Sequence, residues 1–330
     1  MRELRRRNFL IGAAGGIAAH SLSALAQTGR RVRRIGFLGL GSAQGNAAYL
    51  PAFRAGMLEL RWLEGRDYVI DARYANGVAQ ALPGLADELL AIGPDLMLTP
   101  SEGPVRLLAQ KTKTIPIVFA IASDPVGNGL AASLRRPGGN STGLTTLSTE
   151  LSAKQLQLLK EAFPRVAHVA LLFEPDHAGS ASQAKEIEGI APRLGMRITA
   201  IELRLPADIE PGLKRAAALG AQAYMVAAGG FATSQRQVIA DRIIGLKAPA
   251  MFAGSQYVEA GGLMSYAASF TDNFRRAAAY VDKILKGAKP GDLPIQQPIK
   301  FEMVVNMKTA RAIGATFTET FMLRVDRVIE

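Results

Sequence analysis

The chain has 330 residues, of which 39 are Lys or Arg and 28 are Asp or Glu, so its formal net charge is +11. It has no cysteine, which excludes disulfides, thiolate metal sites and a cysteine nucleophile. The basic residues are scattered without interleaved aromatic side chains, so we expect a basic solvated surface and no nucleic-acid partner. With 48% hydrophobic residues, a chain of this length predicts two domains or one bilobal unit.

Residues 1–26 have the pattern of an export signal. A basic start is followed by an uncharged Gly/Ala-rich stretch, and Ala24-Leu25-Ala26 is typical of a signal-peptidase site. Arg6-Arg7-x-Phe9-Leu10 fits the twin-arginine pattern, whose route carries folded proteins. An ordinary secretory signal is the alternative, and a membrane anchor is less favoured because His20 and the serines interrupt a span of about 20 residues. We therefore expect cleavage and release into the periplasm, without a lipid anchor.

After residue 30, apolar β-rich runs alternate with segments that have apolar residues at helical spacing. The expected strands are 34–39, 68–74, 95–99 and 115–120, and the expected helices are 47–63, 82–92 and 104–111. The series then recurs, with strands at 166–173, 196–201, 223–227 and 249–253 and helices at 180–194, 207–219 and 234–246. This alternation predicts parallel sheets covered by helices on both faces.

Two similar segments give the repeat a register. Pro116-Ile117-Val118-Phe119-Ala120 corresponds to Pro249-Ala250-Met251-Phe252-Ala253. Gly36 precedes Ile117 by 81 residues, and Ala170 precedes Ala250 by 80. The chain is therefore expected to contain two similar α/β lobes in tandem.

Residues 254–330 contain too few expected elements for a third lobe: strands near 263–266 and 299–306, and helices near 273–285 and 307–313. We expect them to cross back and complete both lobes, which makes a hinge. The expected division is lobe 1 at 31–145 plus 256–290 and lobe 2 at 146–255 plus 291–330.

A glycine-rich loop, Gly39-Leu40-Gly41-Ser42-Ala43-Gln44-Gly45, follows the first expected strand. A dinucleotide-binding loop has G-x-G-x-x-G spacing, but here Gln44 occupies the place of the third glycine. Asp71 lies too far along the chain to serve as the usual ribose-binding acid. We therefore expect no cofactor, and favour a loop whose backbone N–H groups hold a carboxylate or another anion.

Ser123-Asp124-Pro125 follows the fourth strand and is typical of a helix cap. A carboxylate at this edge of a parallel sheet could also meet a ligand's amino group, and both interpretations can hold together. Farther along, Tyr257, Ser265, Tyr266 and Phe270 gather in the crossing region, where aromatic rings either stack on a ligand or pack between lobes.

A hydrolase is not indicated, because the sequence has no G-x-S-x-G motif. Once His20 leaves with the signal, only two histidines remain, so a histidine-rich metal site is not expected. His168 lies in an apolar strand and is interpreted as a core residue. His177 lies in a loop and is either a ligand contact or an ordinary loop residue. We expect no catalytic residues and no metal.

Two blocks carry a resemblance to a known family. Ser123-Asp124-Pro125-Val126-Gly127 and Pro137-Gly138-Gly139-Asn140-Ser141-Thr142-Gly143 together resemble substrate-binding proteins of ABC transporters, in the family that includes tryptophan-uptake receptors. Other segments that fit the same family are 63–67, 82–83, 272–278, 284–290 and 292–294. The resemblance implies a type I periplasmic-binding fold, with two Rossmann-like lobes joined by three crossings that close on a small solute. It also implies a membrane permease and an ATPase as partners.

Two positions depart from the family pattern. Glu174 stands where relatives usually have Asn, and Ala267 where they usually have Gly after Ser-Tyr. Both positions are expected near the cleft, so the identity of the solute does not carry over from the family.

We therefore predict a monomeric periplasmic receptor that captures an amino acid or similar small carboxylate and contacts the membrane only through its permease. Loops at the carboxyl ends of the strands are expected to line the cleft, with helix N-termini holding a carboxylate, Asp124 or Glu174 an amine, and Tyr257 or Tyr266 an apolar group. The predicted ligand-binding residues are Ser42, Ser101, Ser123, Asp124, Glu174, Ala228, Ser255, Tyr257 and Tyr266. A periplasmic nucleotide-cofactor oxidoreductase and a sensory receptor of the same fold are the alternatives.

Overall fold

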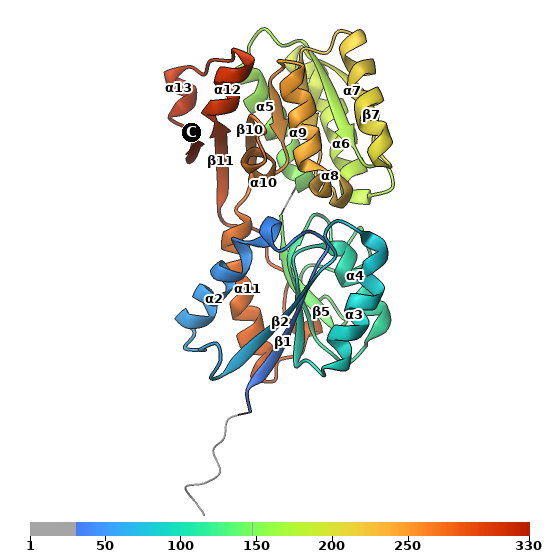
Figure 1. Cartoon of the computed structure of the whole chain (residues 1–330), viewed down its shortest axis with the longest axis vertical. Helices are drawn as coiled ribbons and strands as arrows, with labels where there is room; N and C mark the ends of the chain where they lie inside the picture. Colours follow the sequence, from blue (N-terminus) through green and yellow to red (C-terminus); the bar gives the residue numbers. More distant parts are fainter. Residues whose placement is uncertain (1–30, 147) are drawn as a thin grey trace, which may run out of the picture.

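The computed structural model describes residues 31–146 and 148–330, and the expected export signal at 1–26 lies outside them. Two α/β lobes lie end to end, and the chain passes between them several times (Figure 1). Within the described residues, no helix combines the length and the apolar character needed to cross a bilayer.

Lobe 1 is built on a five-stranded parallel sheet in the order β2-β1-β3-β4-β5. The inner strands β1, β3 and β4 and the edge strand β5 are mostly buried, as apolar runs in a parallel sheet should be, whereas the edge strand β2 is mostly half-buried. Helices α2 and α11 cover one face, and α3 and α4 cover the other. The strands are β1 (Arg33–Gly39), β2 (Tyr68–Tyr74), β3 (Leu96–Thr99), β4 (Ile117–Ala122) and β5 (Ser141–Thr145), and the helices are α2 (Tyr49–Glu59), α3 (Leu82–Ala91), α4 (Glu102–Lys111) and α11 (Phe270–Leu285).

Lobe 2 is built on a seven-stranded sheet in the order β12-β11-β10-β9-β8-β6-β7. Among the described residues of this sheet, β10 and β11 are the one antiparallel pair. The strands are β6 (His168–Phe173), β7 (Arg197–Glu202), β8 (Ala223–Val226), β9 (Ala250–Phe252), β10 (Met264–Ala268), β11 (Phe301–Asn306) and β12 (Arg327–Ile329). The helices are α5 (Ser148–Ala162), α6 (Ala178–Ile190), α7 (Ile209–Ala218), α8 (Gly230–Ser234), α9 (Arg236–Gly245), α10 (Ser255–Glu259), α12 (Met307–Ile313) and α13 (Glu319–Met322).

The register of the repeat is visible in the two sheets. In lobe 1, Gly36 pairs with Met97 and Met97 with Ile117, so the two positions matched in the sequence lie on one row across three strands. In lobe 2, Ala170 and Ala250 flank Tyr224 in the same way. The tandem repeat thus corresponds to equivalent rows of two similar sheets.

The elements in the described part of the chain require three crossings between the lobes: from β5 to α5, from β10 to α11, and from the segment after residue 296 to β11. The second crossing comes later than expected, because β10 pairs with β9 and places residues 264–268 in lobe 2. The third also comes later, because Gln296 is hydrogen-bonded to Gly143 and Thr145 of lobe 1. The division expected from the sequence therefore places residues 256–268 and 291–296 in the wrong lobe.

The second and third crossings lie side by side where they leave lobe 2. Ala268, the last residue of β10, is opposite Phe301, the first residue of β11. The next residues remain joined, since the backbone N of Ser269 donates to the carbonyl of Lys300 at 3.0 Å.

Candidate functional site

A cavity of about 290 Å³ lies between the two lobes. Lobe 1 contributes the segments that follow β1, β3 and β4, including Leu40, Ser101 and Ser123. Lobe 2 contributes the segments that follow β6, β8 and β9, including Glu174 and Ala228. These are the carboxyl ends of parallel strands, where open α/β sheets bind ligands. The volume is close to the lower end of the range for small-molecule pockets.

Glu102, the first residue of α4, holds the lobe 1 wall of the cavity in place. Its buried Oε1 accepts hydrogen bonds from the backbone N and the Oγ of Ser123 and from the backbone N of Asp124. Its Oε2 accepts from Nδ2 of Asn128 at 2.7 Å. Because a buried carboxylate is stable only when such donors replace water, these bonds fix the loop after β4 against α4.

His177 brings lobe 2 to the same carboxylate. Its Nε2 lies 3.4 Å from Oε2 of Glu102, and its Nδ1 caps α6 by accepting from the backbone N of Ser180. The hydrogen bond with Glu102 raises the pKa of His177; burial opposes this, and the negative charges of Glu102 and Glu174 add to it. Burial raises the pKa of Glu102, but the bonds from His177 and Ser123 outweigh it and hold that pKa below its usual range. The pair joins the two lobes across the cavity.

Glu174 also faces the cavity, but its carboxylate caps α8. Oε1 accepts from the backbone N of Ala232 at 2.7 Å, and Oε2 accepts from that of Phe231 at 3.3 Å. A negative side chain is favourable here because the first N–H groups of a helix have no partner within the helix. Both oxygens of the residue expected to bind an amine are therefore already bonded to the protein.

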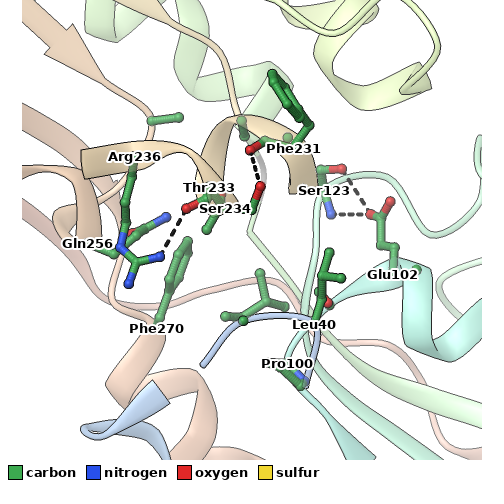
Figure 2. A pocket seen from close by; sticks show the side chains of 18 of the residues that line it. Leu40, Pro100, Glu102, Ser123, Phe231, Thr233, Ser234, Arg236, Gln256 and Phe270 are labelled. Carbon is green, nitrogen blue, oxygen red and sulfur yellow. Dashed lines mark hydrogen bonds between the residues drawn. The ribbon is translucent and has the colours of Figure 1, made fainter. Parts of the chain in front are cut away.

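Arg236 of α9 and Gln256 of α10 lie on the side of the cavity opposite Glu102 and Ser123 (Figure 2). Nη1 of Arg236 donates to the carbonyl of Thr233 at 3.0 Å, and the guanidinium forms no ion pair within the part of the chain that the structure describes. Oε1 of Gln256 is buried without a hydrogen-bond partner among the same residues. An unpaired buried polar atom costs about 1–3 kcal/mol, so this side of the cavity has polar groups available for a ligand.

Ser101 provides a further available group in lobe 1. It is the N-cap residue of α4, yet its Oγ makes no capping bond and is buried without a partner among the described residues. A hydroxyl both donates and accepts, so it suits several ligand groups.

The middle of the cavity is apolar. Leu40, Phe231 and Phe270 line it from three different elements (Figure 2). Tyr49 of α2 also lines it and stacks on Phe274, with ring centroids 4.7 Å apart and planes 5° apart. Burial raises the pKa of Tyr49, so its hydroxyl stays neutral. The cavity thus has an apolar middle and a polar side at each end.

Four of the nine residues predicted for the cleft line the cavity: Ser101, Ser123, Glu174 and Ala228. Two of the others serve local turns instead. Ser42 Oγ accepts from the backbone N of Gly45 at 3.0 Å, and Asp124 Oδ1 accepts from that of Gly127 at 2.8 Å.

The remaining three predicted residues are not among those that line the cavity. Tyr257 is fully buried, with its ring stacked on Phe252 and its hydroxyl 3.1 Å from Oγ1 of Thr233. Tyr266 stacks on Phe301. Ser255 precedes the lining residue Gln256. These aromatic rings therefore pack within lobe 2, which is the alternative that the sequence left open.

The two histidines behave differently. His168 is buried in β6 and is hydrogen-bonded to Thr199 and Arg197, as expected of a core residue. His177 lines the cavity.

Several lining residues were not predicted. Glu102 comes directly after Thr99-Pro100-Ser101, so its place after a strand could have indicated it. Phe231 carried no such signal, because α8 has only five residues and follows Gly229, too short for an apolar period. Arg236 lies in the helix expected at 234–246, but a helical pattern alone does not show which of its residues reach a cavity. The most informative missed residues are Tyr49, Glu102, Phe231, Arg236 and Gln256.

Two lobes with mostly parallel sheets, three crossings and a cavity between them are the features of the type I periplasmic-binding fold. Residues 52–329 match the sequence model of the family described as "ABC transporter substrate binding protein". The chain belongs to that family, and the resemblance predicted from its sequence is confirmed.

Similar proteins agree with this assignment. A "Tyrosine-binding protein" of Clostridioides difficile is 21% identical over 251 residues, which cover 76% of this chain and 72% of that protein. Two crystal structures share the fold at 24% identity and a TM-score of 0.81, each covering 90% of this chain and 100% of the other. One is a conserved domain protein of Vibrio cholerae, and the other is an ABC domain from Streptococcus pneumonia in complex with L-Trp.

Proposed function

We propose that this protein captures a small carboxylate-bearing organic solute, such as an amino acid, and delivers it to a membrane permease driven by an ATPase. The observation that carries the proposal is the cavity between the lobes, where Arg236 has no acidic partner among the described residues and apolar groups lie beside it. The tyrosine and L-Trp named for two similar proteins support this class of ligand.

Closure of the lobes is the proposed signal to the permease. The lining residues come from both lobes, so a bound ligand contacts both only in the closed form. A ligand shifts a conformational equilibrium only through its different affinities for the two forms, and these two-sided contacts provide that difference. The protein would act as a monomer.

The periplasm is the proposed location. The expected twin-arginine signal supports it, and replacing Arg6 and Arg7 with Lys is expected to block export in the producing cell. The purified variant should bind ligand as the wild type does.

Native mass spectrometry of the purified protein tests the proposed function directly. We expect a co-purified small carboxylate, and thermal-shift titration with amino acids and organic acids should then raise the melting temperature. The small-angle scattering radius should fall when the same ligand is added. A stoichiometric flavin or nicotinamide absorbance instead would reject the proposal. Loss of uptake of that ligand in a deletion strain would distinguish transport from a sensory role.

A further inference from the structure

Arg236 of lobe 2 reaches across the cavity to lobe 1. A Cβ added at Gly45, in the segment after β1, would lie 2.6 Å from Nη2 of Arg236. Burial raises the pKa of Tyr49 in α2, the charge of Glu259 adds to this, and the charge of Arg236 opposes it. Both Gly45 and Tyr49 line the cavity. The guanidinium therefore lies between the two lobes.

Although Arg236 approaches lobe 1 closely, it makes no hydrogen bond there among the described residues. Its one hydrogen bond in that part of the chain runs from Nη1 to the carbonyl of Thr233 at 3.0 Å, within lobe 2. A guanidinium carries several N–H donors, so the others have no protein partner. The side chain is half-buried, and burying an unpaired charge is unfavourable because nothing replaces the water that it loses.

Two acids line the cavity, Glu102 and Glu174, and neither gives these donors a partner. Burial raises the pKa of Tyr257, the charge of Glu174 adds to this, and the charge of Arg236 opposes it, so both charges act on one hydroxyl. The oxygens of Glu174, however, accept from backbone N–H groups of α8. Glu102 lies on the opposite side of the cavity (Figure 2). Attraction by Glu174 lowers the cost of burying the guanidinium but leaves its donors unbonded.

A second contact between the lobes acts in the opposite sense. His177 of lobe 2 and Glu102 of lobe 1 meet with Nε2 and Oε2 3.4 Å apart, and no ligand takes part in this contact. By itself it stabilises the closed form of the empty protein. The empty protein stays open only if another group opposes this contact, and Arg236 is placed to do so.

We infer that Arg236 makes a carboxylate the condition for closure, because it opposes closure of the lobes until a carboxylate pairs with its guanidinium. The inference rests on the proposed function and adds a specificity step to it. The apolar part of a solute can contact Leu40 and Phe231 without a carboxylate. Closure around that solute leaves the guanidinium unpaired against Gly45, whereas a carboxylate accepts two parallel hydrogen bonds from it.

The empty protein tests the inference without any ligand. Arg236→Met keeps a long side chain and removes the charge. Because the chain has no cysteine, Gln110→Cys on α4 and Glu188→Cys on α6 provide two unique spin-label positions, on helices whose N-terminal ends meet at the cavity. We expect the pulsed EPR distance between the labels in empty Arg236→Met to match that of the liganded wild type. The empty wild type should instead have the distance of an open form.

Two further variants separate the charge from the shape of the side chain. Arg236→Lys keeps the positive charge, so the empty protein should stay open. Arg242→Met is the matched control and should also stay open, because Arg242 is exposed on the same helix and pairs with Glu210 outside the cavity. Closure of empty Arg236→Lys would contradict the role of the charge. Arg236→Gln replaces Arg236→Met if the latter does not fold.

Matched ligands test whether the carboxylate permits closure. Phenylalanine, tryptophan, leucine and 3-phenylpropanoate are each compared with the primary amide, which has nearly the same shape and no negative charge on that group. For the acid that binds best, the amide should bind the wild type about tenfold or more weakly and leave the label distance at its empty value. In Arg236→Met, acid and amide should differ in affinity by less than about threefold, and the protein should be closed with either.

The outcomes separate the inference from the proposed function. If empty Arg236→Met is as open as the empty wild type, the inference is wrong and the proposed function stands. The same conclusion follows if an amide closes the wild type as fully as its acid does, or if the empty wild type is already closed. If no carboxylate closes the wild type, the proposed ligand class and the inference both fail.

Discussion

Glu102 of lobe 1 and His177 of lobe 2 meet across the cavity, with Oε2 and Nε2 3.4 Å apart. The contact joins groups that belong to the protein itself, so it favours the closed arrangement independently of the ligand. Nδ1 of His177 caps α6 at the same time, which fixes the ring toward Glu102.

This pair predicts that closure depends on pH. The pKa of His177 is raised when Glu102 is near, so the added stabilisation is complete below the ordinary value of 6.5 and is lost as the pH rises through the raised pKa. Protonation at Nδ1 gives up the bond from Ser180, which offsets part of the gain. We expect ligand affinity to be severalfold higher at pH 6 than at pH 8.5, measured by titration calorimetry.

His177→Asn is the control for this effect. Asparagine is a good N-cap residue and keeps the α6 cap, but it does not titrate in this range. Its affinity should vary less with pH than that of the wild type. An unchanged pH profile in this variant would show that another group is responsible.

The absence of a side chain at Gly179 allows α6 of lobe 2 to approach Ser123 of lobe 1 closely. A Cβ at this position of α6 would collide with Oγ of Ser123 in lobe 1. Gly179→Val should therefore hold the lobes apart, weaken ligand binding at least tenfold and increase the small-angle scattering radius of the liganded protein. Gly189→Val, on the same helix with open space around it, should have neither effect.

Asp124 was predicted to contact the ligand, but in the structure its side chain stabilises a turn. Its Oδ1 accepts from the backbone N of Gly127, and the side chain does not line the cavity. Asp124→Ala should lower the free energy of unfolding by about 1 kcal/mol and leave ligand affinity unchanged. Denaturant unfolding and titration calorimetry measure the two quantities separately, and a loss of affinity without a loss of stability would restore a direct role in binding.

Helices α2 and α11 pack closely at Gly56. A Cβ there would overlap the carbonyl oxygen of Arg275, which is backbone and cannot rotate away. We expect Gly56→Ala to destabilise the protein by about 1–3 kcal/mol in thermal unfolding. Gly84→Ala, at an exposed position of α3 with no atom nearby, should instead stabilise it by about 0.5–1 kcal/mol.

The lobes could be predicted from sequence because their strands carry strong local signals. The rows through Gly36 and Ile117 and through Ala170 and Ala250 follow from matching short apolar segments. The position of the second crossing could not be predicted, because a short apolar strand such as β10 has the same sequence pattern in the sheet of lobe 2 as it would have in a connection between the lobes.

The site was harder to predict because its residues combine local and distant roles. A carboxylate in a loop, such as Glu174, can meet a ligand or cap a helix, and α8 has no apolar period that would reveal the helix it caps. Glu102 and His177 come into contact only when the two lobes pack together. A contact between residues so far apart in the chain leaves no pattern in the sequence around either of them.

The neighbouring crossings after Ala268 and before Phe301 have a mechanical consequence. Because β10 and β11 leave lobe 2 as hydrogen-bonded strands, two of the three connections bend together as one ribbon. A ribbon flexes easily across its flat face and resists sliding of one strand past the other. The lobes should therefore swing along one preferred path, so that Arg236 returns to the same place opposite lobe 1 at each closure.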